Sequence, residues 1–223
     1  MNELEKIKEL AEIPMTDDKT TKRVEIIMLK FKENWEVIGE AIRRIIANTN
    51  YPYKLTIFDN RLNTANTSRA WNKLVSESTC DYVLIIDSDA YIPEGIGPCW
   101  LGRMMESIDE TGLVIPVSNL SGGQSQKVGG PKIYPSTTRN RGIWSGYCFL
   151  FKKSLYEQLG PFDERFYLYG QDSEWAHRSK KTGGAVMRED VWVKHIGGYS
   201  MEKNENKDFD KMYARKLFQY LCA

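Results

Sequence analysis

The chain has few of the residues on which disulfide-rich, metal-scaffold and membrane proteins depend. It has four cysteines and two histidines among 223 residues, and the cysteines show neither metal-type spacing nor a disulfide framework. No apolar run approaches the length of a membrane span, and the polar N-terminus is unlike a signal peptide. We therefore expect buried or half-buried thiols, a reducing and cytoplasmic location, and no transmembrane segment. Peripheral association with a membrane stays open.

Net charge is also nearly absent. The formal charge is +1, with 41% apolar and 27% charged residues, which is the balance of an ordinary globular protein. Because this balance gives no overall electrostatic footprint, we expect no nucleic-acid partner. The length suits one sizeable α/β core and would be cramped for two.

The first half of the chain alternates between strand and helix patterns, and the second half is less regular. We expect strands at 24–31, 53–58, 82–86, 113–117, 144–152 and 185–194, helices at 35–46, 65–78, 98–110, 154–159, 172–181 and 209–221, and a long loop at 119–142. The regular alternation at the start indicates an α/β fold with a mostly parallel central sheet flanked by helices.

The most informative segment is Asp87-Ser88-Asp89, which directly follows the apolar run 82–86. Residues two apart on a strand project to the same side, and ligands of open α/β sheets bind beyond the carboxyl ends of the strands. Two carboxylates at that place suit Mg²⁺ or Mn²⁺, which commonly hold substrate phosphates. The segment therefore predicts a metal and nucleotide site, with a polar turn at a strand end as the alternative.

Six short segments of the chain occur in an order and at spacings that match a known family. They are Ile57-Phe58-Asp59-Asn60, Asn63…Asn72, Asp87-Ser88-Asp89, Gly160-Pro161-Phe162-Asp163-Glu164, Tyr169-Gly170-Gln171-Asp172-Ser173-Glu174 and His195-Ile196-Gly197-Gly198. In this order and spacing they resemble the GT-A glycosyltransferases, and among them the inverting enzymes of family 2. The resemblance covers about residues 23–200. It implies a GT-A (Rossmann-like) fold, a nucleoside diphosphate sugar donor and a divalent metal.

The chain departs from this family in three places. Leu29-Lys30-Phe31-Lys32 ends the first strand where the family commonly has Pro-Thr-Tyr-Asn, Gln171 replaces a Glu, and Glu174 replaces an Asp. We divide the chain into a helix and linker at 1–22 and a single GT-A domain at 23–223. Within that domain we expect a nucleotide-sugar half at about 23–118, an acceptor half at about 119–200 and a C-terminal helix at about 206–221.

The resemblance implies roles for the residues of the Asp-x-Asp segment and for the late histidine. Asp89 is expected to bind the metal directly, while Asp87 faces the ribose or reaches the ion directly or through water, and Ser88 contacts the donor. His195 would be a second protein ligand, and its neutral imidazole favours Mn²⁺ over Mg²⁺. An ordinary structural histidine is the alternative.

Donor binding is also expected at the end of the second strand and on the following helix. Asp59 would accept from the N3–H of uracil or thymine, with Asn60 beside it, so a UDP-type donor is preferred over a GDP-type donor. Arg69 and Asn72 lie three apart on one helix face. They either pack against the nucleotide or tie the helix to the sheet.

The acceptor side should carry the general base. Asp172 is the candidate that takes the proton from the acceptor hydroxyl, with Glu174 as the alternate and helix capping as the competing role. Trp144, Gly146 and Tyr147 form either a floor on which a sugar stacks or part of the core. The acceptor itself is a glycan, a protein or a lipid-linked molecule.

Three other classes of protein fit parts of the pattern. A haloacid dehalogenase phosphatase also has Asp-x-Asp after a strand, but that motif normally lies near the N-terminus and continues with Gly-Thr rather than Ala90-Tyr91. A sugar nucleotidyltransferase would have a Gly-rich loop after its first strand, where this chain has no glycine. A non-catalytic sugar- or nucleotide-binding relative is the third alternative, and the intact Asp89, Asp172 and His195 argue against it.

Overall fold

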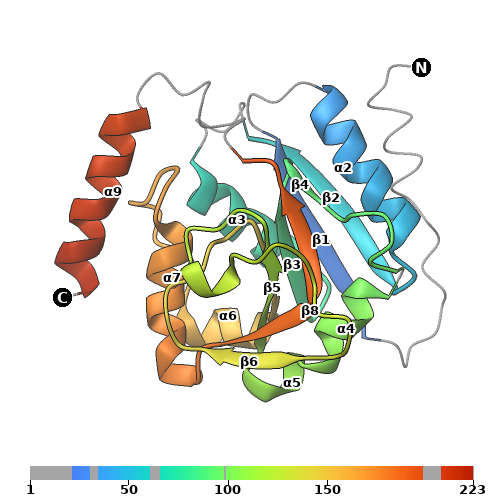
Figure 1. Ribbon diagram of the computed structural model, residues 1–223. Helices are drawn as coiled ribbons and strands as arrows, with labels where there is room; N and C mark the ends of the chain where they lie inside the picture. The colour runs from blue at the N-terminus through green and yellow to red at the C-terminus, as the bar shows by residue number, and fades with distance from the viewer. Residues whose placement is uncertain (1–21, 31–34, 61–65, 98, 198–206, 223) are drawn as a thin grey trace.

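The computed structural model describes residues 22–30, 35–60, 66–97, 99–197 and 207–222 (Figure 1). Residues 1–21 of the predicted N-terminal helix and linker, Asn63 of the Asn63…Asn72 segment, and Gly198 of the last segment lie outside this part of the chain. None of the described helices combines the length and apolar composition needed to span a bilayer.

The elements follow the predicted alternation. They are β1 (Val24–Lys30), α2 (Trp35–Asn48), β2 (Tyr53–Asp59), α3 (Thr67–Glu77), β3 (Tyr82–Asp87), β4 (Ala90–Tyr91), α4 (Trp100–Glu106), α5 (Ile108–Thr111), β5 (Leu113–Ser118), η2 (Gln124–Gln126), β6 (Thr137–Asn140), β7 (Cys148–Lys152), α6 (Lys153–Leu159), α7 (Gln171–Ser179), η3 (Lys180–Thr182), β8 (Ala185–His195) and α9 (Lys207–Cys222).

Three expectations need correction. The helix expected at 98–110 is two helices, α4 and α5, and the strand expected from Trp144 begins only at Cys148. The long loop at 119–142 contains the short strand β6, which pairs with β8. Polar side chains gave no strand pattern there, because Thr137, Thr138 and Arg139 are all exposed at the edge of the sheet.

The strands of the described chain form one eight-stranded sheet in the order β2-β1-β3-β7-β5-β8-β4, with β6 paired to β8. β1 is parallel to both neighbours, and β5 is parallel to β8. β7 is antiparallel to β3 and to β5, so the direction reverses twice across it. β1, β2, β3, β5 and β8 therefore run the same way, which confirms the mostly parallel sheet.

Helices cover both faces of this sheet and enclose two apolar clusters (Figure 1). In β3, Leu84 and Ile86 face the cluster under α2 and α4, while Val83 and Ile85 face the one under α3, α6 and α7. Both faces of β3 are thus buried, as expected for a central strand. The strand ends at Asp87, so its polar continuation emerges at the edge of the sheet where the carboxyl ends of the parallel strands meet.

Candidate active site

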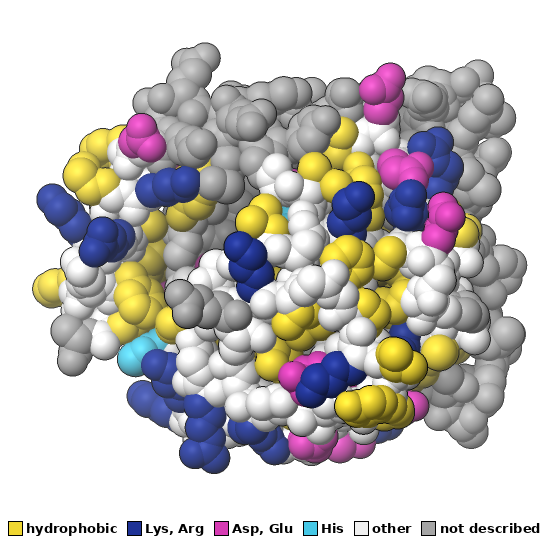
Figure 2. Space-filling model, in the orientation of Figure 1, with side chains coloured by type: hydrophobic (Ala, Val, Ile, Leu, Met, Phe, Trp, Pro, Cys, Tyr) yellow, Lys and Arg dark blue, Asp and Glu magenta, His cyan; other side chains and the backbone are white. Residues whose placement is uncertain are grey.

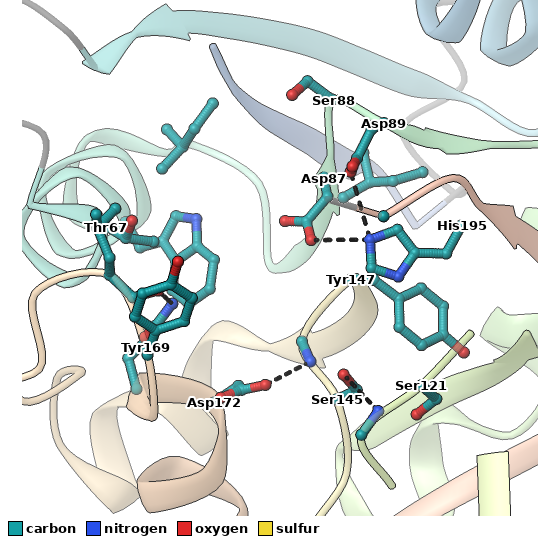
Figure 3. Close-up of a pocket in the computed structure, with 18 of the residues that line it drawn as sticks. Thr67, Asp87, Ser88, Asp89, Ser121, Ser145, Tyr147, Tyr169, Asp172 and His195 are labelled. Carbon is teal, nitrogen blue, oxygen red and sulfur yellow. Dashed lines mark hydrogen bonds and ion pairs between the residues drawn. The ribbon is translucent and has the colours of Figure 1, made fainter. Parts of the chain in front are cut away.

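A cavity of about 760 Å³ opens at the carboxyl ends of the parallel strands (Figure 3). Its walls come from the ends of β1, β2 and β3, from the start of α3, from residues 120–122 and 145–147, from residues 168–172 and from the end of β8. Segments from both halves of the chain therefore share one cavity, in the place where open α/β sheets bind ligands.

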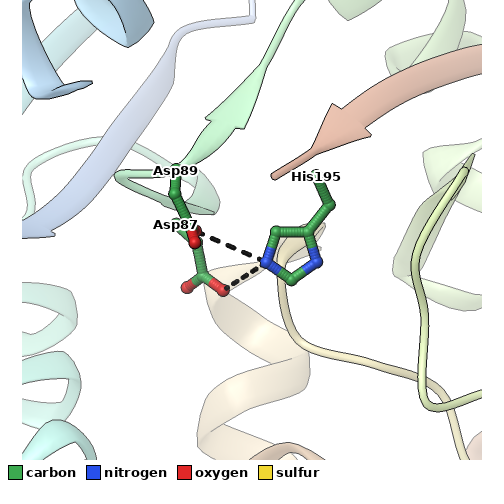
Figure 4. Close-up of side chains that lie close together, drawn as sticks. All are labelled: Asp87, Asp89 and His195. Carbon is green, nitrogen blue, oxygen red and sulfur yellow. Dashed lines mark ion pairs between the residues drawn. The ribbon is translucent and has the colours of Figure 1, made fainter. Parts of the chain in front are cut away.

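Asp87, Asp89 and His195 meet on one side of this cavity (Figure 4). The short ladder between β4 and β8 pairs Ala90 with His195, and the Ile196 amide donates to the Asp89 carbonyl at 3.0 Å. This ladder brings His195, at the end of β8, beside the Asp-x-Asp segment. The His195 Nε2 lies 3.4 Å from Asp89 Oδ1 and 3.9 Å from Asp87 Oδ2.

The imidazole of His195 is oriented by its surroundings. Its Nδ1 lies 3.2 Å from the Leu120 carbonyl oxygen, which can only accept, so Nδ1 carries the proton and Nε2 is left to face the carboxylates. The ring stacks on Tyr147 with centroids 5.3 Å apart. Carbonyl groups commonly fix metal-binding histidines in this way.

The three side chains fit a divalent cation. Each offers one ligand atom, and these atoms lie within 4.8 Å of one another. Burial by itself disfavours the charged imidazole, but the hydrogen bond with Asp89 and the charge of Asp87 outweigh it, so the pKa of His195 is raised. A divalent cation between the same groups would take the place of that proton. Two carboxylate oxygens and an imidazole nitrogen are a donor set suited to Mn²⁺.

Asp172 lines the same cavity from the start of α7. The Gly146 amide donates to its Oδ2 at 2.7 Å and the Ser173 amide to its Oδ1 at 2.7 Å. Burial raises the pKa of the Asp172 carboxyl, and these two N–H groups oppose the shift. A half-buried carboxyl with a raised pKa and a fixed orientation is suited to accept a proton.

Two glycines make this arrangement sterically feasible. A Cβ on Gly146 would lie 2.7 Å from the Cβ of Asp172, so only glycine lets the 145–147 segment approach the carboxylate. Gly170 precedes α7 with a φ of +84°, and a Cβ there would lie 2.9 Å from the ring of Phe166. Both positions therefore require glycine for the backbone to present Asp172 to the cavity.

Several residues expected at the site line the cavity with the triad and Asp172. They are Asn60, Ser88, Gly146 and Tyr147. Asn60 is 2% exposed, and its Oδ1 has no hydrogen-bond partner, which leaves one buried acceptor at this end of the cavity. Asp59 does not line the cavity. Its Oδ2 lies 4.0 Å from Nζ of Lys30. Lys30 is buried and belongs to the segment at the end of β1 where this chain differs from the family pattern.

Arg69 and Asn72 do not line the cavity. They form hydrogen bonds with residues 162–164. The Arg69 Nε donates to Glu164 at 3.1 Å. Asn72 donates to the Phe162 carbonyl at 2.8 Å and accepts from the Phe162 amide at 2.8 Å. Both residues therefore fasten α3 to the 162–164 segment, which leads into the wall before Asp172.

Glu174 and Trp144 also lie outside the cavity lining. Glu174 is 7% exposed and pairs with Arg178, whose Nε lies 2.6 Å from its Oε1, so it is unsuited to be the alternate base. Trp144 is 1% exposed and packs against Phe149, with ring centroids 5.0 Å apart. It belongs to the core and forms no floor for a sugar.

No sequence pattern predicted a role for Gln126, which supports the cavity walls formed by residues 120–122 and 145–147. It is fully buried, and its Oε1 accepts from the Ser145 amide at 2.7 Å and from the Ser121 hydroxyl at 3.2 Å. Its Nε2 donates to the Pro116 carbonyl at 3.2 Å. A single amide thus holds together two loops of the cavity, and such a contact has no periodic sequence pattern.

Solved structures that match the fold of this chain include GalNAc-T7 and TarS. The structure of GalNAc-T7 with UDP, GalNAc and Mn²⁺ matches with a TM-score of 0.57 and 12% identity, covering 81% of this chain and 45% of that one. TarS residues 1–349 from S. aureus match with a TM-score of 0.55 and 13% identity, covering 77% and 60%. TarS with UDP-GlcNAc matches with a TM-score of 0.58 and 13% identity, covering 88% and 66%.

The chain thus spans about half to two thirds of the length of these structures. Their low identities make them evidence for the fold, which is GT-A. A search of curated proteins by sequence returned no match. Residues 42–160 match the family model described as glycosyl transferase family 2, which is more than half of the 223 residues. The chain belongs to glycosyl transferase family 2.

Proposed function

We propose that this protein is an inverting, metal-dependent glycosyltransferase that moves a sugar from a nucleoside diphosphate sugar to an acceptor hydroxyl. The observation that carries the proposal is that the Asp87–Asp89–His195 triad and the oriented Asp172 carboxylate line one cavity. Sugar transfer needs a stabilised leaving diphosphate and an activated hydroxyl. The triad and Asp172 offer one group for each need.

Asp89, His195 and Asp87 would hold the divalent cation, with Asp87 bound directly or through water. When bound, the cation neutralises the charge that develops on the leaving diphosphate. Leu120 and Tyr147 keep the imidazole turned so that Nε2 faces the carboxylates. The imidazole in this ligand set supports Mn²⁺ over Mg²⁺.

Asp172 would act as the general base. Its carboxylate takes the proton of the acceptor hydroxyl while that oxygen attacks the anomeric carbon from the face opposite the diphosphate. A single direct displacement of this kind inverts the anomeric configuration, as in inverting glycosidases. The Gly146 and Ser173 amides hold the carboxylate in place during this step.

The donor is proposed to be of the UDP type, because structures of the same fold were solved with UDP or UDP-GlcNAc. Asn60 and Ser88 would contact the donor. Residues 121, 122 and 145 line the wall near Asp172 and are candidates to contact the acceptor, which is a glycan, a protein or a lipid-linked molecule. We propose residues 23–223 as a single GT-A domain, and the four unpaired cysteines support a cytoplasmic location.

A panel of nucleotide sugars tests the proposal. With Mn²⁺, UDP-sugars should raise the melting temperature more than GDP-sugars do, and EDTA should remove the effect, because a ligand that binds the folded state stabilises it by mass action. The best donor is then incubated with candidate acceptors, and NMR of the product gives its anomeric configuration. Retention of configuration would contradict the base role of Asp172. Metal-dependent binding with no transfer to any acceptor would instead favour a non-catalytic relative.

A further inference from the structure

One face of α9 leaves large apolar side chains in solvent. Phe209 is 63% exposed, Met212 49%, Tyr213 45% and Tyr220 82%. Positions three, four, seven and eleven apart lie close together on a helix, so these residues form one stripe, here named the α9 stripe. Four large exposed side chains on one helix face, three of them aromatic, point to an interaction surface.

The opposite face of α9 packs against the body of the protein. Ala214 is 6% exposed, and its Cβ would be 3.4 Å from a Cβ placed on Gly170. Phe218 meets His177 edge-on with ring centroids 6.1 Å apart. These contacts fix the orientation of the helix, so the stripe faces outward. The helix itself lies at the edge of the molecule (Figure 1).

Basic side chains gather beside the C-terminal part of the stripe. Arg215 and Lys216 are exposed there, while the acidic residues of α9, Asp208 and Asp210, lie in its first turn on either side of Phe209. Lys180 and Lys181 of η3 are also exposed. Figure 2 shows yellow and dark-blue side chains along α9, a magenta side chain at its upper end, and a dark-blue group below the lower end of α7. The overall charge of +1 hides this local excess.

We propose that the α9 stripe docks the protein on an anionic membrane surface. Tyrosine and phenylalanine favour the headgroup region, and lysine and arginine beside them contact anionic lipids. A second copy of the chain is a poor occupant, because a two-fold contact through the stripe would bring Arg215 and Lys216 close to their own copies. A fluid anionic surface accepts both the aromatic and the basic side chains.

The face of α9 opposite the stripe packs against one wall of the cavity. Lys211 lies over the ring of Tyr169, with its Nζ 5.6 Å from the centroid, and Tyr169 lines the cavity. The helix that carries the stripe therefore packs directly behind one wall of the site.

Vesicle co-sedimentation of the full chain tests the proposal without donor or metal. Wild type should sediment with vesicles of phosphatidylcholine and phosphatidylglycerol, less with phosphatidylcholine alone, and less at high salt. Phe209→Ser with Tyr220→Ser, and separately Arg215→Gln with Lys216→Gln, should each weaken binding by about tenfold or more. Melting temperature and calorimetric affinity for UDP with Mn²⁺ should be unchanged, because these side chains are exposed.

The matched control is Ile133→Ser with Tyr134→Ser, an apolar pair that is 100% and 68% exposed elsewhere on the surface. This variant should bind the anionic vesicles as wild type does. Equal losses in the control and stripe variants would overturn the proposal, as would absence of vesicle binding by wild type. A wild-type dimer in sedimentation velocity that the Phe209→Ser, Tyr220→Ser variant makes monomeric would assign the stripe to a second copy instead.

Discussion

The two sides of the cavity are built in different ways. On the metal side, Asp87 and Asp89 follow a strand and His195 ends another, and the β4–β8 ladder joins them. On the base side, Asp172 begins a helix, and its carboxylate is held by the amide of Gly146, which comes from a segment without regular structure. The metal side is thus placed by a ladder of backbone hydrogen bonds, and the base side by the close approach of a loop.

This difference predicts different sensitivities. Changing a side chain on the metal side removes a ligand atom from a frame that stays in place, because the ladder uses backbone atoms only. Changing the base side can move the base without touching it, since a single added carbon on Gly146 would collide with Asp172. The following predictions probe this contrast, beginning with the largest effect.

Asp172→Asn should have the largest effect on turnover. The amide cannot accept the proton, and loss of a general base typically costs ~10²–10⁴-fold. Both carboxylate oxygens accept from backbone N–H groups, so the asparagine also loses one of these bonds. Donor affinity measured by calorimetry with Mn²⁺ should hardly change while kcat falls.

The matched control for this variant is Glu174→Gln. Because Glu174 pairs with Arg178 and does not line the cavity, its turnover should stay within a few-fold of wild type at a temperature where it is folded. The assignment of the base would be wrong if the two variants exchanged these results.

Asp89→Ala should abolish metal-dependent donor binding. The substitution removes a proposed direct ligand, and even outer-shell partners of a metal are worth ~10–100-fold in affinity, so we expect a loss of at least ~100-fold. Calorimetry with UDP and Mn²⁺ measures it. Asp81→Ala is the control, because Asp81 is exposed just before the opposite end of β3. Unchanged affinity in Asp89→Ala would place the metal elsewhere.

Gly146→Ala tests the base side without changing a reacting group. The new Cβ would lie 2.7 Å from the Cβ of Asp172, so the loop or the base must shift, at a cost of about 1–3 kcal/mol in stability. We expect kcat to fall by ~10-fold or more with donor affinity nearly kept. Gly129→Ala, where a Cβ meets nothing within 4 Å, should behave as wild type. Equal activities of these two variants would argue against precise placement of Asp172.

The same contrast explains what the sequence could predict. Strand periodicity located β3 and β8, so the positions of Asp87, Asp89 and His195 at strand ends followed from the pattern and from family resemblance. The fold was predictable for the same reason, since alternating strands and helices dictate a parallel sheet. Functional side chains at the ends of regular strands can therefore be located from the periodic pattern of those strands.

The contacts that hold the base side leave no such signal. Gln126 joins two loops through hydrogen bonds to Ser145 and Ser121, and nothing in its neighbourhood is periodic. Asn72 was expected either at the nucleotide or against the sheet, and instead it holds the backbone of Phe162. These partners are far apart in the chain, so only the folded structure defines which residues meet.

The smallest expected effect is on the pH dependence of kcat. This measurement distinguishes Asp172 from Glu174, the two acidic residues in the first turn of α7. Burial raises the pKa of Asp172 despite the opposing amides of Gly146 and Ser173. Because a base acts when ionised, the acid limb of kcat should lie above the ordinary aspartate pKa, and Glu174→Gln should leave it unmoved.

Stability should respond with the opposite sign. A carboxyl whose pKa is raised on folding binds its proton more tightly in the folded state. Its stabilising contribution is therefore full below the unfolded pKa and is lost as pH rises through the folded pKa. Asp172→Asn lacks this contribution, so the melting temperature of wild type relative to the variant should increase on acidification. Melting curves of both proteins across this pH range measure the difference, and a constant difference would mean that folding leaves the pKa of Asp172 unchanged.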